Sequence, residues 1–359
     1  MDQKRLETLL AAVHRVGATA LHLVPGRAPT LRVQRRLVTG DEAPVEAAGI
    51  EELIRDMLFA DHRQRLAQKG QVEVLYVARG GRRYRATIAA EDGAHTLVLR
   101  PVPESPPKLD ALDLPEQVGA FTQARAGLVL VAGCFGSGRS TTLAALVDRL
   151  NQDASRHIVT IEDSIEFLHP PGPALLHQRE VAVHVGTAAD GVRQAVALGA
   201  DTVVVNRIPD ADTLEAVLAA AEAGCLVFGA VEAGSVPGAL AELTLLVALE
   251  QRPRLRTRLA GALRGIAAKS LLQRSHRPGR VAVVEIVVAN PAVRAAIKLG
   301  NYHELPAIMQ RCRGLGMQTV DIALRGLLAR HLVGQDEALL HASDPEQVVS
   351  NGRNPAVLS

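Results

Sequence analysis

A glycine-rich segment in the middle of the chain constrains the fold more than any other feature. The sequence GCFGSGRST, residues 133–141, follows the apolar run GLVLVA and precedes the helical stretch TLAALVDRL. A strand, a glycine loop and a helix in this order are the context of a phosphate-binding loop, in which backbone N–H groups close around a phosphate at the positive end of a helix. A fortuitous glycine-rich turn is the alternative. The pattern predicts a nucleotide-type loop in an α/β domain.

The loop departs from the usual pattern G-x-x-x-x-G-K-[ST] at one position. Arg139 stands where the lysine is expected. Its guanidinium keeps the charge but is a wide planar fork, so we expect it to hold phosphate without reaching the position between the β- and γ-phosphates. Ser140 keeps the hydroxyl that would ligate Mg²⁺. The candidate nucleotide-binding residues are Gly133, Gly136, Ser137, Gly138, Arg139, Ser140 and Thr141.

Continuous apolar runs alternate with helical stretches in this part of the chain. The first run, residues 127–133, leads into the glycine-rich loop. Four further runs occupy residues 157–163, 201–206, 225–231 and 281–289. Helical spacing of apolar residues covers 236–249, 254–272, 303–312 and 319–332. Uninterrupted β-branched runs are typical of parallel strands that helices cover on both faces. We therefore expect an α/β fold with its site at the carboxyl ends of the strands.

The first hundred residues predict a separate α+β domain. Apolar residues share one face of a first helix at Leu6, Leu9, Leu10 and Val13. Alternating stretches at 20–24, 30–34, 72–78 and 95–100 predict a small sheet. The following segment holds five prolines and predicts an extended linker. The expected organisation is a domain at 1–100, a linker at 101–115, a second domain at 116–342 and a flexible tail at 343–359.

Composition excludes several classes of function. The net charge is only +2 and aromatic residues make up 2% of the chain, so neither a bulk field nor stacking platforms favour a nucleic-acid partner. Cys134, Cys225 and Cys312 match no metal spacing, which favours thiols in a reducing compartment. No apolar run approaches the roughly 18 residues of a membrane span. We expect no nucleic-acid partner, and membrane association only through another protein.

Short motifs along the chain resemble the PilT-like branch of the secretion and pilus ATPases. They are GATALHL (17–23), GRRYRAT (81–87), TIEDSIEF (160–167), HQRE (177–180), AEAGCLVFGAVEA (221–233), RVAVVEI (280–286) and GMQTVD (316–321). The resemblance implies a PAS-like N-terminal domain and a RecA-like P-loop NTPase domain with a helical C-terminal part. It implies a cytoplasmic hexamer at the inner-membrane platform protein of a type IV pilus machine. ATP and Mg²⁺ would be its cofactors, and pilus retraction in twitching motility its output.

The same resemblance assigns roles to acidic residues of the site, and one of these positions is reversed in charge. Glu162, Asp163 and Glu166 keep the acidic box that in the family orients Mg²⁺ and the attacking water. Ser140 and Glu162 would then be the metal ligands. A second acidic position of the family falls on Arg207, so a cation replaces a carboxylate there.

Other family positions are partly kept. Two family histidines correspond to Cys225 and Glu232, and a family arginine corresponds to Ala197. Candidate phosphate-sensing arginines are retained at Arg83, Arg85, Arg100 and Arg193, with ordinary solvated cations as the alternative. The segment PAVRAAIKLGN, residues 291–301, resembles the retraction motif and keeps Arg294. In the predicted helix at 254–272, Arg254, Arg258 and Lys269 would share a solvated or intersubunit face.

Three functional hypotheses follow. The favoured one is a ring subunit with weakened nucleotide binding and lost hydrolysis, a regulator or accessory motor subunit that forms a homo-hexamer or a mixed ring with an active paralogue. The second is an active ATPase powering pilus retraction. The third is a structural interaction protein with an empty P-loop fold.

Overall fold

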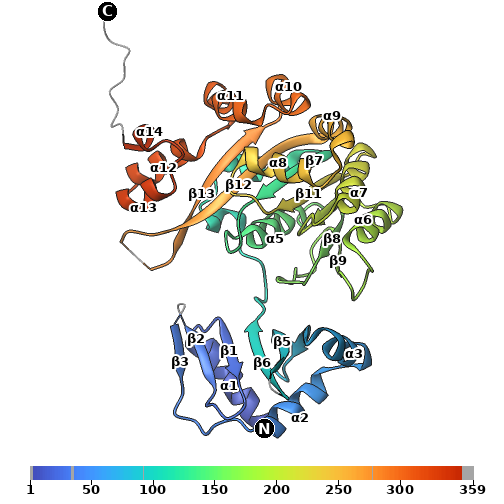
Figure 1. Cartoon of the computed structure of the whole chain (residues 1–359), viewed down its shortest axis with the longest axis vertical. Helices are drawn as coiled ribbons and strands as arrows, with labels where there is room; N and C mark the ends of the chain where they lie inside the picture. The colour runs from blue at the N-terminus through green and yellow to red at the C-terminus, as the bar shows by residue number, and fades with distance from the viewer. Residues whose placement is uncertain (1–2, 34–35, 92, 277, 350–359) are drawn as a thin grey trace, which may run out of the picture. The chain divides into compact units, whose positions relative to one another are not determined.

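The computed structural model describes residues 3–33, 36–91, 93–276 and 278–349. The chain divides into two compact units (Figure 1). The first consists of Met1–Ser105 with Glu166–Leu168, and the second of Pro106–Ile165 with His169–Ser359. Among the described residues, no helix combines the length and the apolar character that a bilayer crossing requires.

The first unit is an antiparallel sheet with three helices. Its helices are α1 (Gln3–Arg15), α2 (Ala47–Met57) and α3 (Ala60–Lys69), and its strands are β1 (Ala20–Leu23), β2 (Thr30–Val33), β3 (Arg36–Thr39), β4 (Gln71–Val77), β5 (Arg83–Glu91) and β6 (Ala94–Pro101). The strands lie in the order β3-β2-β1-β6-β5-β4. The apolar face predicted for the first helix is confirmed, because Leu6, Leu9, Leu10 and Val13 are all buried.

The second unit is built on a seven-stranded sheet. Its strands are β7 (Gly127–Ala132), β8 (His157–Glu162), β9 (Leu175–Glu180), β10 (Thr202–Val205), β11 (Leu226–Val231), β12 (Leu263–Gln273) and β13 (Arg280–Val288). Their order is β13-β12-β7-β11-β10-β8-β9. All neighbours pair in parallel except β12 and β13, which are antiparallel. The α/β class expected from the sequence is confirmed.

Helices cover both faces of this sheet. They are α4 (Glu116–Ala120), α5 (Arg139–Leu150), α6 (Ala188–Ala197), α7 (Ala211–Glu222), α8 (Val236–Leu245), α9 (Arg252–Ala262), α10 (Pro291–Leu299), α11 (Leu305–Arg311), α12 (Val320–Ala329), α13 (Gln335–Leu340) and α14 (Pro345–Val349). Short 3-10 turns are η1 (Leu109–Leu112), η2 (Phe121–Gln123), η3 (Leu249–Gln251), η4 (Tyr302–Glu304) and η5 (Arg313–Leu315).

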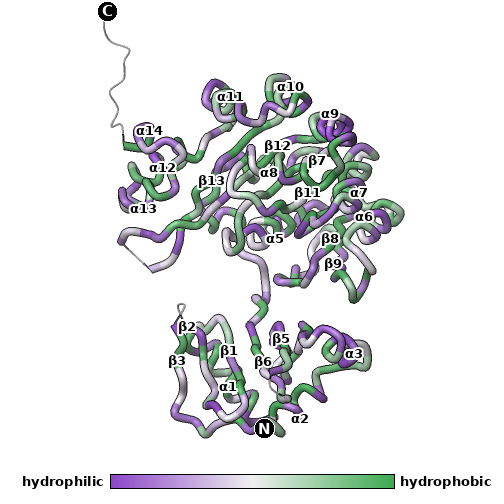
Figure 2. Tube along the Cα trace, viewed as in Figure 1, coloured by the Kyte–Doolittle hydropathy of each residue, from purple (hydrophilic) through white to green (hydrophobic). Residues whose placement is uncertain are grey.

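The packing of strand β7 determines where the glycine-rich loop begins. Leu128 and Leu130 belong to the hydrophobic core on one face, whereas Val129 and Val131 belong to the core that contains residues of α5 on the other. Figure 2 shows strands β7 and β11 as largely hydrophobic and the outer helix α9 as largely hydrophilic. A strand packed on both faces is held rigidly, so the loop that follows β7 starts from a fixed point.

One predicted helix and one predicted strand direction were wrong. The helix expected at 254–272 ends at Ala262, and the chain continues as β12, which lies between β7 and β13. Lys269 therefore shares no helical face with Arg258. Strand β13 runs antiparallel to β12, not parallel as expected. The alanine-rich stretch has no clear period, so burial between two strands decides its conformation.

The structure describes residues 343–349, the first part of the segment expected to be a flexible tail. Residues 345–349 form helix α14, and Val348 is 4% exposed within a small apolar core. The Asp321 carboxylate accepts hydrogen bonds from the backbone N–H groups of Ser343 and Asp344, which fixes the approach to α14. Residues 350–359 of the predicted tail lie outside the described residues.

The predicted retraction motif contains a helix-capping residue. Arg294 on α10 donates to the carbonyl of Gly261 at 2.9 Å and to that of Leu263 at 3.0 Å, and it also contacts the Ala260 carbonyl. A cation at the C-terminal carbonyls of a helix satisfies their free lone pairs and the helix dipole. Arg294 thus ties α10 to the end of α9.

Candidate functional site

The glycine-rich loop joins β7 directly to helix α5. Gly136 and Gly138 have φ angles of 78° and 84°, in the left-handed region that residues with a Cβ rarely adopt. Gly138 is the N-cap of α5, so the loop ends where the free N–H groups of the first helical turn begin. The loop conformation and the helix start therefore present backbone donors together, as a phosphate site requires.

Two polar side-chain atoms of the loop have no hydrogen-bond partner among the described residues. Ser137 is 5% exposed and its hydroxyl has no hydrogen-bond partner among the described residues. The Nη1 atom of Arg139 is also buried without a partner in that part of the chain. Buried donors are rarely left unpaired, because each costs the free energy of its lost hydration. An anionic phosphate oxygen would supply the missing acceptors, so these residues fit a nucleotide phosphate.

The other candidate residues follow neighbouring strands at the carboxyl edge of the sheet. Glu162 is the last residue of β8, Arg207 comes two residues after β10, and the exposed Glu232 comes directly after β11. Strand β11 lies next to β7, so Glu232 follows the strand beside the loop. This edge is where parallel α/β sheets bind their ligands.

Arg207 turns towards the acidic box. Its Nε atom lies 2.7 Å from Oδ2 of Asp163, and the two side chains are 53% and 42% exposed. The side-chain oxygen of Asn206 accepts a hydrogen bond from the backbone N–H of Asp163 at 3.0 Å. Both residues that follow β10 therefore hold Asp163. An exposed pair of this kind adds little stability, but it places a guanidinium on a carboxylate of the site.

Glu162 is oriented by a residue of its own strand and by one of the neighbouring strand β9. Its Oε1 atom accepts hydrogen bonds from the Thr160 hydroxyl at 2.7 Å and from Nε2 of Gln178, on β9, at 3.1 Å. Glu166 is half-buried in the segment after β8. Among the described residues, no three His, Cys, Asp or Glu side chains form a group suited to a metal ion. The role of Glu162 and Ser140 as Mg²⁺ ligands stays a prediction.

Two of the candidate phosphate-sensing arginines, Arg193 and Arg85, form ion pairs within their own units. Arg193 on α6 is exposed and forms ion pairs with Asp190 and with Asp212 on α7. In the first unit, Arg85 lies opposite Arg100 in the β5–β6 register and forms a 3.1 Å ion pair with Glu73. Alternation along β5 puts Arg83 on the same face, while Tyr84 between them is buried. Phosphate sensing stays a prediction for all four.

Lys269 is a site residue that the sequence did not reveal. It lies on β12 and is 5% exposed. Its Nζ atom donates to the Thr142 hydroxyl at 2.7 Å and to the Gly138 carbonyl at 3.3 Å. Burial, with a smaller contribution from the Arg280 cation, lowers the pKa of Lys269 to about 8. The wrong helix prediction concealed it, since only a strand next to β7 brings this side chain to the loop.

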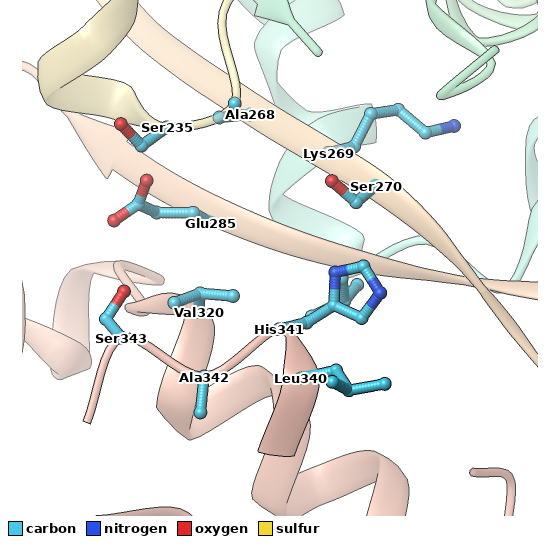
Figure 3. Close-up of a pocket in the computed structure, with 12 residues that line it drawn as sticks. Ser235, Ala268, Lys269, Ser270, Glu285, Val320, Leu340, His341, Ala342 and Ser343 are labelled. Atoms are coloured by element: carbon cyan, nitrogen blue, oxygen red, sulfur yellow. The ribbon is translucent and has the colours of Figure 1, made fainter. Parts of the chain in front are cut away.

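Glu285 on β13 is a second buried ionisable residue that the sequence did not reveal. Its carboxylate accepts a 2.6 Å hydrogen bond from the backbone N–H of Val236, the first residue of α8. Burial raises the pKa of Glu285 to about 7, against the opposing effect of that hydrogen bond. Glu285 borders a cavity of about 320 Å³ that His341 and Ser343 also line. Figure 3 shows its carboxylate near Ser235 and the Lys269 side chain extending away from it.

The raised pKa of Glu285 predicts a pH-dependent stability. The folded protein keeps this proton up to about pH 7, whereas the unfolded chain loses it near pH 4.5. The contribution is therefore complete below pH 4.5 and is lost as pH rises through 7. From the pKa values of 4.5 in the unfolded chain and about 7 in the folded protein, we expect the free energy of unfolding to fall by about 3 kcal/mol at most between pH 5 and 7.5. Urea unfolding at these two pH values measures the change.

The matched variant is Glu285→Gln, which keeps an acceptor for the Val236 N–H group but cannot ionise. Its stability should lack this fall between pH 5 and 7.5, and it should exceed that of the unchanged protein at pH 7.5. An equal fall in both proteins would assign the pH dependence to other groups.

Comparison with known proteins places the chain in a family. The sequence model of the family described as type II/IV secretion system protein matches residues 63–326. The protein YggR of Escherichia coli is 32% identical over 314 residues, which cover 88% of this chain and 95% of YggR. The type IV pilus retraction ATPase PilT of Pseudomonas aeruginosa is 31% identical over 338 residues, covering 94% of this chain and 98% of PilT.

The fold agrees with these sequence relationships. The crystal structure of the pilus retraction motor PilT with bound ADP matches 94% of this chain and 97% of that one, with a TM-score of 0.87 and 30% identity. The expected resemblance to PilT-like ATPases is thus confirmed in sequence and in structure. The chain belongs to the type II/IV secretion system protein family, with PilT among its relatives.

Proposed function

We propose that the chain is a PilT-like ring subunit of a type IV pilus or related secretion machine that binds nucleotide weakly and does not hydrolyse ATP. It acts as a regulator or accessory motor subunit, in a homo-hexamer or in a mixed ring with an active paralogue. Its partner at the membrane is the inner-membrane platform protein of the pilus. The family membership and the ADP bound in the PilT structure support a nucleotide ligand.

The 2.7 Å contact between Arg207 and Asp163 carries this proposal. Phosphoryl transfer needs a metal ion and an oriented water at the terminal phosphate, and carboxylates hold both. A guanidinium beside Asp163 neutralises that carboxylate and repels a divalent cation. Hydrolysis therefore loses an acid at 207 and the free charge of a second acid at 163.

The phosphate loop supports binding without efficient hydrolysis. The Ser137 hydroxyl and Arg139 Nη1 would donate to phosphate oxygens, while Ser140 and Glu162 would complete the coordination of Mg²⁺. Arg139 places a wide, planar guanidinium at a position where a compact lysine ammonium would stabilise the charge that develops on the terminal phosphate. The site keeps attraction for a phosphate group and loses stabilisation of the transition state.

The expected size of the loss is large. Removing a positioned group that orients or deprotonates water costs about 10²- to 10⁴-fold in rate. Removing one preorganised electrostatic contact costs about 10²- to 10³-fold. The two losses act on one site and do not add. Either one reduces a slow motor to a rate too low for mechanical work.

Cys134 provides a direct test of nucleotide binding. This thiol is exposed within the loop, whereas Cys225 is buried and serves as an internal control. We expect MgATP and MgADP to slow alkylation of Cys134 in a saturable way, measured by mass spectrometry of the two peptides. No protection at any nucleotide concentration would favour the empty-fold hypothesis.

ATP turnover is measured on the same preparation, with Pseudomonas aeruginosa PilT as the reference. We expect phosphate release at the background rate under conditions where PilT is active. Sustained turnover that disappears in Glu162→Ala would contradict the proposal and establish an active ATPase. Addition of the chain to an active paralogue should change the turnover of that paralogue if mixed rings form.

A further inference from the structure

A buried lysine reaches the phosphate loop from a neighbouring strand. Strand β12 pairs with β7 so that Ala268 lies opposite Ala132, the last residue before the loop. Lys269 therefore begins beside the start of the loop. Its ammonium group reaches the other end, at the Gly138 carbonyl and the Thr142 hydroxyl. The side chain thus spans the loop along its sheet side.

This ammonium group has no acidic partner in the described part of the chain. Its two hydrogen-bond acceptors, a carbonyl and a hydroxyl, are neutral, and no ion pair joins it to a carboxylate among the described residues. The nearby charge that acts on it is the Arg280 cation, which opposes protonation. A buried charge is normally paired, so an anion is missing from this position.

The loop itself shows the same deficit. The Ser137 hydroxyl and Arg139 Nη1 are buried donors without acceptors among the described residues. They belong to the same loop that the Lys269 ammonium contacts. Within the described ranges, three polar groups around one loop, two from the loop and one from β12, therefore have no anionic partner. A phosphate group bound in the loop would serve all three.

We propose that Lys269 supplies, from strand β12, the buried ammonium charge that the phosphate loop lacks at position 139, and that its counter-ion is the phosphate chain of a bound nucleotide. This inference rests on the nucleotide binding in the proposed function. Gly138 and Thr142 hold the ammonium beside the first turn of α5. Arg139 and Lys269 together then replace the single lysine of the usual loop. Arg139 contributes a planar guanidinium at the start of α5, and Lys269 contributes a compact ammonium group from β12.

The test compares ADP with adenosine in two variants of Lys269. Lys269→Met removes the charge and keeps the apolar length, while Lys269→Gln removes the charge and keeps a hydrogen-bond donor. Both should weaken ADP binding at least tenfold and leave adenosine binding unchanged, measured by calorimetry at pH 7. Lys298→Met, at an exposed lysine on α10, is the matched control and should bind ADP like the unchanged protein.

Two further readouts separate binding from folding. The melting temperature of Lys269→Met should not fall, because replacing an unpaired buried charge by an apolar side chain is neutral or stabilising. Lys269→Arg should retain most of the ADP affinity. Adding Arg139→Lys to Lys269→Met should restore it, since the lysine returns to the loop.

Each outcome bears on the proposal separately. Unchanged ADP affinity in Lys269→Gln would overturn it and leave the proposed function intact. ATP turnover by the unchanged protein would contradict the proposed loss of hydrolysis, while the Lys269 comparison would still report on phosphate binding. Absence of ADP binding in the unchanged protein would overturn this inference together with the nucleotide part of the function.

Discussion

The double variant Arg139→Lys with Arg207→Glu is expected to hydrolyse ATP at least about 10²-fold faster than the unchanged chain. The first change returns a compact ammonium to the loop. The second removes the guanidinium that lies 2.7 Å from Asp163 and supplies a carboxylate in its place. Steady-state phosphate release under saturating MgATP measures the gain.

The single variant Arg207→Gln separates two causes of the loss. It breaks the ion pair with Asp163 but adds no acid. If freeing Asp163 is sufficient, Arg207→Gln should recover a large part of the activity of Arg207→Glu. If a carboxylate at 207 is required, only the glutamate variant should gain activity. Equal, high turnover in the unchanged protein and in the double variant would contradict the inactive-site interpretation.

Gly133→Ala is expected to abolish nucleotide binding and to lower the free energy of unfolding by about 1–3 kcal/mol. A Cβ at this position would lie 2.7 Å from the Lys269 carbonyl oxygen and would also collide with the Ser137 hydroxyl. The carbonyl belongs to the backbone of β12, between two paired strands, and cannot move aside cheaply. The loop must therefore shift away from its phosphate-binding conformation.

Gly261→Ala is the matched control for this substitution. Gly261 lies in helix α9, where an added Cβ would meet no atom within 4 Å. Alanine is favoured over glycine within helices, so stability should stay the same or rise by up to about 1 kcal/mol. Urea unfolding and Cys134 protection by MgADP measure both variants. Normal protection in Gly133→Ala would show that the loop tolerates a side chain at its first glycine.

The central strand, the loop and the following helix were predictable because their signals are local. A continuous apolar run such as residues 127–132 is typical of a strand that is buried on both faces. The loop after it contains backbone positions with positive φ, and these positions require glycine. The proximity of Arg207 to Asp163 follows from the same logic. Both come just after parallel strands, and β8 and β10 are neighbours.

Strand β12 and its buried lysine were not predictable in this way. The sequence LRGIAAKSLL fits a helix about as well as a strand, because small alanines leave no clear period. Its conformation depends on pairing with β7, which lies far earlier in the sequence, and with β13, which follows it. Local sequence does not reveal either pairing. Glu285 likewise gains its role from α8, whose Val236 lies 49 residues earlier.

Lys269 on β12 and Glu285 on β13 are both buried and ionisable, and their ionisation determines the pH at which ligand binding is best detected. Lys269 is protonated below about pH 8, and Glu285 is ionised above about pH 7, so both unfavourable charges coexist in the interval between. Stability is expected to be lowest there, with relief of the lysine's cost as pH rises from 8 towards 10.5. A screening campaign based on thermal shifts would therefore resolve phosphate-bearing compounds best in buffers near neutrality, where an anion has the most to compensate.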